Sequence, residues 1–389
     1  MLHQTTISAG RTLKEEKNFY RLLTNLMKAF FILHLASFLL LTYANPLNEL
    51  DNDDTPGKIH TLYQQHYSKY KTYLKKMGKK HDPSVPEPIR LLKFVQSLKM
   101  IDEHNQRYSK GLETYKVDLN KMSDWTEEEK ERLRGYYPNL TEYAEGDLSR
   151  IIRGNITTTI PKSFDYRKKI TVLPASDQGR CGVCFIFSAL GALEMYVALR
   201  TKKRPVKLSV QDVMDCSGME KCKGRGGNEP AVFRWVAEHG VKTDKSYPYK
   251  ENDSVSCPRN TPQRRKYGLA DAFYLPPSNE QILKKILALY GPVCVSLHSS
   301  LQSFVAYRSG KMGWNILSSK TVGALHGVKK DTVVFALGYL CAVLVVFRTY
   351  QSSNERIIWG TDWGEKGYMR ISINPKENCN LYLESLAAM

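Results

Sequence analysis

Apolar residues recur with helical spacing through the early part of the chain. From about Ile59 to Tyr136 the sequence is strongly charged, and its apolar positions lie three and four residues apart. One helix is predicted to begin near Glu87, with an apolar face made by Leu91, Phe94, Leu98 and Ile101. This pattern is typical of a helical domain whose outer face is solvated.

A helix of different character is predicted further along. Between Phe185 and Leu199 large apolar side chains recur at mixed three- and four-residue steps, with Ala and Gly between them. This pattern predicts a helix that is buried in the protein. A shorter helix is predicted up to Cys216, with Ser209 as its N-cap residue.

The last third of the chain is rich in strand-forming residues. Short β-branched or aromatic runs cover Gly291–Leu297, Thr332–Phe347 and Tyr368–Ile373. The apolar run that ends at Phe347 is short and interrupted by Gly338, so buried strands are predicted there, with no stable membrane span. We therefore expect an α+β fold in which a helical half faces a β-rich half across a cleft.

The N-terminal region has the layout of a signal peptide. Residues 1–28 are polar and basic, and an almost unbroken apolar run follows from Ala29 to Leu41. Small Ala44 then offers a cleavage point, so we assign residues 1–44 to a signal peptide region. Met27 is the expected true start, and a signal anchor is the alternative. Secretory entry implies conditions that permit disulfides.

The composition of the 389-residue chain excludes few classes. Its formal charge of +18 comes from Lys and Arg spread along the chain rather than interleaved with aromatics on one element, so no nucleic acid partner is expected. Attraction to acidic substrates, glycans or membranes stays open. The eight cysteines form no clustered CxxC pairs, so they do not suggest a zinc site. The sequence implies neither a metal nor an organic cofactor. Cys181 and Cys184 form a single CxxC, which leaves a thiol oxidoreductase as the weakest alternative.

The candidate chemistry lies at the start of the buried helix. Cys184 is predicted at or just before the helix N-terminus, where the helix dipole and unpaired N–H groups stabilise a thiolate. Gln178, a few residues upstream, has an amide that can donate a hydrogen bond to a developing oxyanion. The alternative is that Cys184 is a buried structural cysteine and Gln178 a loop residue.

The same stretch resembles the nucleophile segment of papain-like cysteine proteases of the cathepsin L and F type. The pattern Q-G-x-C-G-x-C, followed by an aromatic residue and F-S, spans residues 178–188. The resemblance implies that Cys184 is the nucleophile, Gln178 the oxyanion-hole residue and Cys181 a disulfide cysteine. Val183 replaces a small polar residue of the family pattern, and Phe185 replaces a tryptophan.

The preceding helical region resembles the inhibitory propeptide of the same proteases. The family motif R-x3-F-x2-N-x3-I-x3-N is matched by Arg90, Phe94, Ile101 and Asn105, with Ser97 in place of an asparagine. The next motif, G-x-N-x-F-x-D, is represented by Asp118, Asn120, Met122 and Asp124. We therefore expect a propeptide with its linker over residues 45–155, acting as an intramolecular inhibitor, and a two-lobed papain-like peptidase domain over 156–389.

Further positions in the peptidase region match the family framework. The resemblance implies the disulfides Cys181–Cys222 and Cys216–Cys257. Gly226 and Gly227 fall where the family lays extended backbone against the substrate, although a simple glycine-rich turn is the alternative. Trp359 opens a W-G-x-x-W-G motif and is the third expected substrate-binding residue.

The catalytic base is the missing part of the pattern. Alignment with the family places Cys341 at the histidine position, and a second register places Thr332 there instead. Ile357-Ile358 stand where an asparagine and a serine are expected, and a short deletion before Trp359 is the alternative that removes the asparagine. Among the histidines of this region, His239 is expected to cap a helix and His298 to follow a strand, which leaves His326 as the candidate base.

Three hypotheses account for the missing base. Residues 323–341 are extra sequence from a mis-predicted or alternatively spliced transcript, or the chain is an inactive homologue that binds partners, or His326 reaches Cys184. The resemblance implies a hydrolase, a cysteine-type endopeptidase acting on peptides or proteins and made as a zymogen, lysosomal or extracellular. The alternative is a catalytically inactive secreted binding protein on the same scaffold.

Overall fold

The computed structural model describes most of the chain beyond its N-terminal region. The described residues are 56–79, 84–135, 161, 163–219, 222, 226–252, 256–258, 263–267, 272–274, 280–313, 339–348, 352–371 and 385–388. The chain divides into two compact units, residues 1–68 and 69–389. Of the first unit, residues 56–68 are described, and they form the beginning of helix α2 (Pro56–Lys76). The predicted signal peptide lies outside the described residues.

The second unit begins with helices whose ends are fixed by local sequence. Helix α3 (Glu87–Ser109) has a proline in its first turn and Arg107 in its last. Helix α4 (Glu127–Glu131) starts with a capping box, in which the Thr126 hydroxyl accepts from Glu129 N–H and the Glu129 carboxylate accepts from Thr126 N–H. Between them lies strand β1 (Tyr115–Val117). The predicted helix from Glu87 is confirmed.

The remaining helices surround a buried one. Helix α6 (Cys184–Thr201) packs against α7 (Val210–Cys216), α8 (Glu229–His239) and strands of the sheet, and nearly all its residues are buried. Ser209 caps α7, since its hydroxyl accepts from Asp212 N–H, as predicted. The short elements are η1 (Tyr166–Lys168), α9 (Glu280–Leu289) and α10 (Gln302–Val305).

One sheet collects the strands of the described residues. Its order is β1-β5-β8-β7-β6-β4-β9-β3, and β2 pairs separately with β6. The strands not yet defined are β2 (Ser163–Asp165), β3 (Ala272–Tyr274), β4 (Val293–His298), β5 (Tyr307–Met312), β6 (Tyr339–Arg348), β7 (Ser352–Arg356), β8 (Tyr368–Ile371) and β9 (Ser385–Ala388). Only the β5–β8 pair among these is parallel. The N-terminal strand β1 thus extends the edge of the later sheet through antiparallel pairing with β5.

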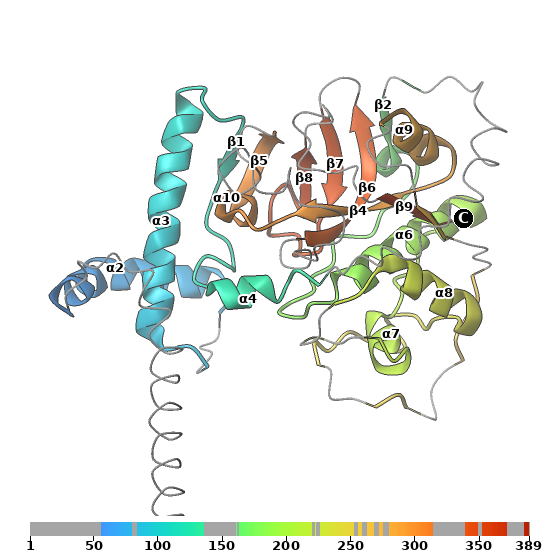
Figure 1. Ribbon diagram of the computed structural model, residues 1–389, viewed down its shortest axis with the longest axis horizontal. Coiled ribbons are helices and arrows are strands. Elements are labelled where there is room, and N and C mark those ends of the chain that lie inside the picture. The colour runs from blue at the N-terminus through green and yellow to red at the C-terminus, as the bar shows by residue number, and fades with distance from the viewer. Residues whose placement is uncertain are drawn as a thin grey trace, which may run out of the picture. The chain divides into compact units, whose positions relative to one another are not determined.

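Helices and strands separate into two groups, as predicted. Helices α6, α7 and α8, drawn in green and yellow-green, lie together, and the orange and red strands β5 to β8 form the other group (Figure 1). Helix α6 contacts both groups, since it packs on β4 and β6 as well as on its neighbouring helices. This position explains why its sequence lacks a polar face.

Helix α6 is long and apolar enough to cross a membrane by length and composition alone. However, 78% of its 18-residue window is buried inside the protein. The helix therefore has the properties of a core helix in the part of the chain that the structure describes.

Candidate active site

Cys184 is the first residue of α6, and its side chain is fully buried. The preceding residue, Val183, has φ −111° and ψ 31°, so the helical conformation starts at the cysteine itself. The first turn contains no acidic residue. The positive end of the helix dipole therefore acts on the Cys184 thiol without a competing negative charge in that turn.

Gln178 is held beside the start of α6 by its own backbone. Its N–H donates to the carbonyl of Ile358 (2.9 Å), and its carbonyl accepts from the Tyr249 hydroxyl (2.9 Å). The buried side-chain amide donates through Nε2 to the carbonyl of Cys181 (2.7 Å) and to that of Leu133 (3.0 Å). One amide group thus joins the Cys184 segment to a residue 45 positions upstream.

A disulfide fixes the loop between these two residues. Cys181 is bonded to Cys222, and Gly182 N–H donates to the Cys222 carbonyl (3.3 Å). Val183 N–H donates to the Cys181 carbonyl (2.9 Å). The loop that leads into α6 is therefore tied at one point by a covalent bond and at two by hydrogen bonds.

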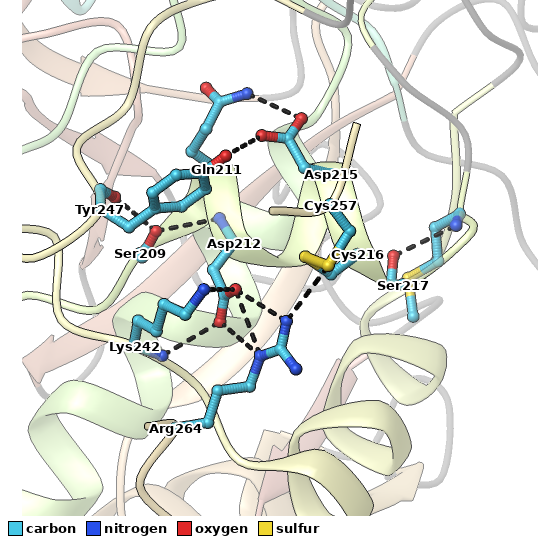
Figure 2. Close-up of a disulfide and its surroundings, with 11 residues drawn as sticks. Ser209, Gln211, Asp212, Asp215, Cys216, Ser217, Lys242, Tyr247, Cys257 and Arg264 are labelled. Atoms are coloured by element: carbon cyan, nitrogen blue, oxygen red, sulfur yellow. Dashed lines mark hydrogen bonds and ion pairs between the residues drawn. A yellow bond between two sulfur atoms is a disulfide. The ribbon is translucent and has the colours of Figure 1, made fainter. Parts of the chain in front are cut away.

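A second disulfide, Cys216–Cys257, ties the end of α7 to a distant segment (Figure 2). Beside it, the buried Asp212 carboxylate accepts from Arg264 Nε (2.9 Å) and from the Lys242 backbone N–H (3.1 Å), and the Lys242 ammonium lies 3.2 Å away. Two cations around one buried carboxylate satisfy its charge. This cluster anchors α7 against the segments that carry Lys242 and Arg264.

The backbone of Gly135, in the N-terminal part of the unit, lies against Gly182, Gly226 and Gly227. The Gly135 carbonyl accepts from Gly227 N–H (2.9 Å). A Cβ built on Gly135 would lie 1.7 Å from the Gly182 carbonyl oxygen, and one built on Gly226 would lie 2.1 Å from the Gly135 oxygen. Gly135, Gly182 and Gly226 therefore allow three chain segments to approach at backbone distance.

The glycine pair also borders an aromatic ring. A Cβ built on Gly227 would lie 2.6 Å from the ring of Phe185, the residue that follows the cysteine. Gly226 has φ +91°, in the region that favours glycine. Gly226 thus requires glycine both for its positive φ and for lack of space. Gly227 requires glycine for lack of space alone.

Buried charges hold this N-terminal part together. Arg90 on α3 donates to Glu129 on α4 through Nη1 (3.0 Å) and Nη2 (2.9 Å), and both side chains are buried. Burial alone would favour the neutral acid, but the Arg90 hydrogen bonds and charge keep the pKa of Glu129 below its usual value. The fork-shaped pair therefore couples α3 to the start of α4.

Asp124 is the centre of a second buried cluster. Its fully buried carboxylate pairs with the Lys79 ammonium and accepts from the hydroxyls of Tyr70 and Tyr73 (both 3.3 Å). Burial raises the pKa of the Tyr73 phenol, and the Asp124 charge raises it further. The phenols therefore stay protonated donors, which satisfies the carboxylate.

Asn120 connects this part to the later chain. Its Nδ2 donates to the Val305 carbonyl (2.7 Å), which also accepts from the Trp363 indole N–H (2.8 Å). Together with the β1–β5 pairing, this contact seats the N-terminal part on the α10–β5 region. The Val305 carbonyl therefore links Asn120 of the N-terminal part to Trp363 of the later chain.

Trp359 is buried in an aromatic cluster beside the site. Its ring packs edge-on against Phe304 (5.8 Å between centroids) and Trp363 (5.3 Å), and its backbone forms a bridge with Asp177. The indole Nε1 is buried and has no hydrogen-bond partner among the described residues. Trp359 also borders a crevice of about 780 Å³ whose walls come from both parts of the unit, including Lys121 and Asp177, which form an ion pair.

The two residues before Trp359 are apolar and buried. Ile357 is fully buried and Ile358 has 2% exposure. On β6 the backbone of Cys341 lies opposite Ser296 of β4. His326 lies outside the described residues, His298 is the last residue of β4, and His239 ends α8, where its Nδ1 lies 3.1 Å from the Trp235 carbonyl. No group of three or more His, Cys, Asp or Glu residues is placed to share a metal ion in the part of the chain that the structure describes.

Comparison with known proteins identifies the family. A model described as papain family cysteine protease matches residues 160–389, more than half of the chain, and one described as cathepsin propeptide inhibitor domain matches residues 70–129. The chain belongs to the papain family of cysteine proteases. It therefore carries a cathepsin-type propeptide ahead of a papain-family domain.

Individual relatives agree with this assignment. A cathepsin L-like peptidase of Aedes aegypti is 32% identical over 336 residues, which cover 82% of this chain and 92% of the relative. Cathepsin S of Mus musculus is 32% identical over 302 residues, covering 76% of this chain and 82% of the relative. The solved digestive procathepsin L2 proteinase of Tenebrio molitor larval midgut aligns with a TM-score of 0.68 at 23% identity, covering 83% and 99% of the two chains, and it shows the shared fold.

The family assignment confirms the predicted fold class and the resemblance from which it came. The structure brings Gln178, Cys181 and Cys184 together at the start of α6, and it places the Gly226–Gly227 pair beside the propeptide backbone. His326 is not among the residues that can be placed.

The sequence did not indicate which residues of the N-terminal part meet the site. Leu133 and Gly135 follow the recognised propeptide motifs and carry no motif of their own. A glycine directly after the charged segment Glu127–Arg134 was the available signal, because glycine permits a close backbone approach. The close approach of Gly135 also involves Gly182 and Gly226, which lie far from Gly135 in sequence.

Proposed function

We propose that this chain is a cysteine endopeptidase made as a zymogen, with Cys184 as its nucleophile. One observation carries the proposal: the Gln178 amide, next to the start of the Cys184 helix, donates to a peptide carbonyl of the propeptide at 3.0 Å. Oxyanion-hole donors work at about 2.7–3.1 Å from the oxygen that they stabilise. The Gln178 amide, which the reaction requires as an oxyanion donor, therefore already binds a peptide carbonyl.

In the proposed reaction, the Cys184 thiolate attacks the carbonyl carbon of a peptide bond. A C–S bond forms, and the carbonyl oxygen becomes an oxyanion stabilised by Gln178 Nε2 and the Cys184 backbone N–H. Collapse breaks the C–N bond, and the amine leaves after it accepts a proton from the general acid. Water then hydrolyses the thioester and releases the acid and the thiol.

The substrate backbone is proposed to lie along Gly226 and Gly227, with Trp359 as part of the same site. The Gly227 N–H is the donor that the propeptide now occupies through Gly135. A substrate strand in its place gains the same backbone hydrogen bond. Removal of the propeptide thus has to precede turnover.

The proton carrier is assigned to His326, the remaining histidine candidate of the peptidase region. The competing proposal is a non-catalytic homologue that binds peptide-like partners in the same cleft. It is favoured by Ile357, which is fully buried at the position where the family pattern has an asparagine. An isoleucine cannot donate a hydrogen bond that orients an imidazole ring.

The domain plan belongs to the same proposal. Residues 1–44 are the signal region, 45–155 the propeptide with its linker, and 156–389 the peptidase domain. The two disulfides are consistent with the secretory pathway, and a lysosomal or extracellular destination follows from it.

A thiol-directed epoxide probe tests the nucleophile after propeptide removal. We expect covalent labelling of the wild type and none of Cys184→Ala, together with hydrolysis of a fluorogenic peptide that His326→Ala abolishes. Labelling without hydrolysis would reject the endopeptidase and support the non-catalytic homologue. In that case Cys341→His combined with Ile357→Asn is the matched gain-of-function variant, because it restores the family residues at the two altered positions.

A further inference from the structure

Strand β4 packs on helix α6, and two contacts show how the strand and the helix are aligned. The Cys294 side chain on β4 is hydrogen-bonded to Ser188 on α6. A Cβ built on Gly291, just before β4, would lie 3.3 Å from the ring of Tyr196, which is about two turns further along α6. The contacts advance along β4 as they move back along α6, so the two elements run antiparallel.

The same alignment brings Ser296 of β4 to the level of Cys184. The step from Ser188 back to Cys184 is one turn, about 6 Å along the axis, and both residues lie on one face of α6. The step from Cys294 on to Ser296 is about 7 Å along the strand, and both residues lie on one face of the sheet. The two steps have the same direction and nearly the same length, so Ser296 lies across from the start of α6.

Cys341 of β6 is the register partner of Ser296. Strands β4 and β6 pair antiparallel, with Ser296 opposite Cys341 and Cys294 opposite Val343. Directly opposed residues of such a pair belong to the same face of the sheet. Helix α6 covers the face to which Cys294 belongs, and β6 itself packs on α6. The sheet register therefore places Cys341 on the face that α6 covers, at the level of Cys184, independently of any alignment with the family.

We propose that Cys184 and Cys341 form a reversible disulfide that masks the nucleophile. Cys184 carries a thiol in this structure, and its position at the start of α6 favours the thiolate, which is the form that attacks a disulfide sulfur. The bond depends only on where the two cysteines lie. Its regulatory effect rests in addition on the proposed function, in which Cys184 is the nucleophile.

The bond forms in two exchange steps with a low-molecular-weight disulfide such as oxidised glutathione. The Cys184 thiolate attacks one sulfur of that molecule, whose S–S bond breaks, and one small thiolate leaves. The Cys341 thiolate then attacks Sγ of Cys184, the mixed disulfide breaks and the second small thiolate leaves. Two protein thiols are thereby oxidised, and the small disulfide is reduced to two thiols that take up the two protons. The two disulfides of the protein are consistent with the secretory pathway, where such oxidants are present.

Cys294 belongs to the same face of the sheet, and two observations disfavour it as the partner of Cys184. It lies at the level of Ser188, one turn of α6 beyond Cys184. Burial raises the pKa of the Cys294 thiol well above its usual value, and the charge of Glu229 raises it further. A thiol that stays protonated does not exchange. Cys294 is therefore the matched control, since it is a strand cysteine opposite a residue only two positions from Cys341.

Disulfide mapping of the full chain tests the proposal. The chain is held in a series of glutathione redox buffers until its composition is constant, because the buried Cys184 reacts through local opening. The remaining thiols are blocked with N-ethylmaleimide under denaturing conditions, and the non-reduced digest is analysed by mass spectrometry. The wild type is compared with Cys341→Ser and with the control Cys294→Ser. The two known disulfides in the same digest report that each variant has folded.

We expect the oxidising buffers to produce a peptide that links Cys184 to Cys341, and this peptide to disappear as the buffers become more reducing. The link should persist in Cys294→Ser and be lost in Cys341→Ser, which should instead hold glutathione on Cys184. A Cys184–Cys294 link in the wild type would overturn the proposal. Glutathione on wild-type Cys184 without a link, or thiols at both positions in every buffer, would also overturn it.

This readout is separate from the test of the proposed function. A linked peptide is detected by its mass, whether or not the chain hydrolyses a substrate. A chain that forms the link but cleaves no fluorogenic peptide under reducing conditions, after propeptide removal, would reject the endopeptidase and keep the disulfide. A chain that cleaves the peptide but never forms the link would do the reverse.

Discussion

Gly135 lies against the loop that leads into Cys184. Its carbonyl accepts from Gly227, and its Cα faces Gly182 and Gly226 without room for a side chain. A Cβ on Gly135 would meet the Gly182 backbone, one on Gly226 would meet the Gly135 backbone, and one on Gly182 would lie 2.6 Å from the Arg132 carbonyl oxygen. The Cys184 side chain itself is fully buried.

Gly135→Val is expected to open this contact. The added side chain cannot fit against the Gly182 carbonyl, so the segment after α4 must lift and expose Cys184. Alkylation of Cys184 by iodoacetamide in the intact zymogen should then be about tenfold faster or more. Gly111→Asn, at a left-handed glycine with open space around it, is the control and should leave the rate unchanged. Equal rates in the two variants would contradict the role assigned to Gly135.

Gln178→Ala tests the oxyanion contact at the same scale. Removal of the amide takes away a donor aimed at the reacting oxygen, so kcat/KM of the activated enzyme should fall by about 10²–10³. The KM should change little, because the contact strengthens in the transition state. A fall in affinity with kcat unchanged would show that Gln178 only binds ground-state peptide.

At the scale of elements, α3 and α4 are joined by the Arg90–Glu129 pair. Both side chains are buried, so loss of one partner leaves a charge without compensation. Glu129→Gln is expected to destabilise the zymogen by about 3 kcal/mol at neutral pH. Chemical denaturation of the full chain measures this difference.

The same pair has a defined pH dependence. The pKa of Glu129 is lowered below its reference value of 4.5, so its stabilisation is present above that pH and is lost as the pH falls through the lower folded-state value. The stability difference between wild type and Glu129→Gln should therefore shrink in acid. A difference that stays constant down to pH 3 would show that the ion pair is not its source.

Helix α6 carries a buried acid, Glu194, whose pKa is shifted in the direction opposite to that of Glu129. Glu194 accepts from Leu208 N–H (2.8 Å), and burial raises its pKa to about 7, although the nearby Arg356 works against this shift. The folded state thus holds a proton that the unfolded chain has lost above pH 4.5, so stability falls as the pH rises from 4.5 to 7. Glu194→Gln should remove up to about 3 kcal/mol of this decline. Parallel pH profiles of the melting temperature in wild type and variant would contradict the prediction.

At the scale of the whole molecule, two disulfides with 41-residue separations fix the helical part. Cys216–Cys257 holds α7 beside the Asp212 cluster, whose cations come from two later segments (Figure 2). Such a cross-link restricts the unfolded chain as well as the native one.

Cys216→Ser with Cys257→Ser is expected to cost about 2–5 kcal/mol of unfolding free energy. Guanidinium unfolding of the zymogen measures this loss, and the wild type under reducing conditions is the reference for both disulfides together. A double variant as stable as the wild type would mean that the Asp212 cluster alone holds α7.

Local patterns predicted the elements well where one strong periodicity was present. The apolar spacing placed α3 at Glu87 and the buried helix at residues 185–199, and Ser209 was a correct N-cap prediction. On α3, Leu91 and Phe94 are buried, but Leu98 and Ile101 are only partly so. Ile101 still packs against the main hydrophobic core, and periodicity does not measure how much protein covers a face.

The sequence by itself determined the family and the position of Cys184 at a helix start, because each follows from residue identities at fixed spacing. Only the tertiary structure decided which groups meet. It joined Gln178 to Leu133 and placed Gly135 among Gly182, Gly226 and Gly227. Contacts between residues far apart in the chain depend on the packing of whole elements, and no local pattern encodes that packing.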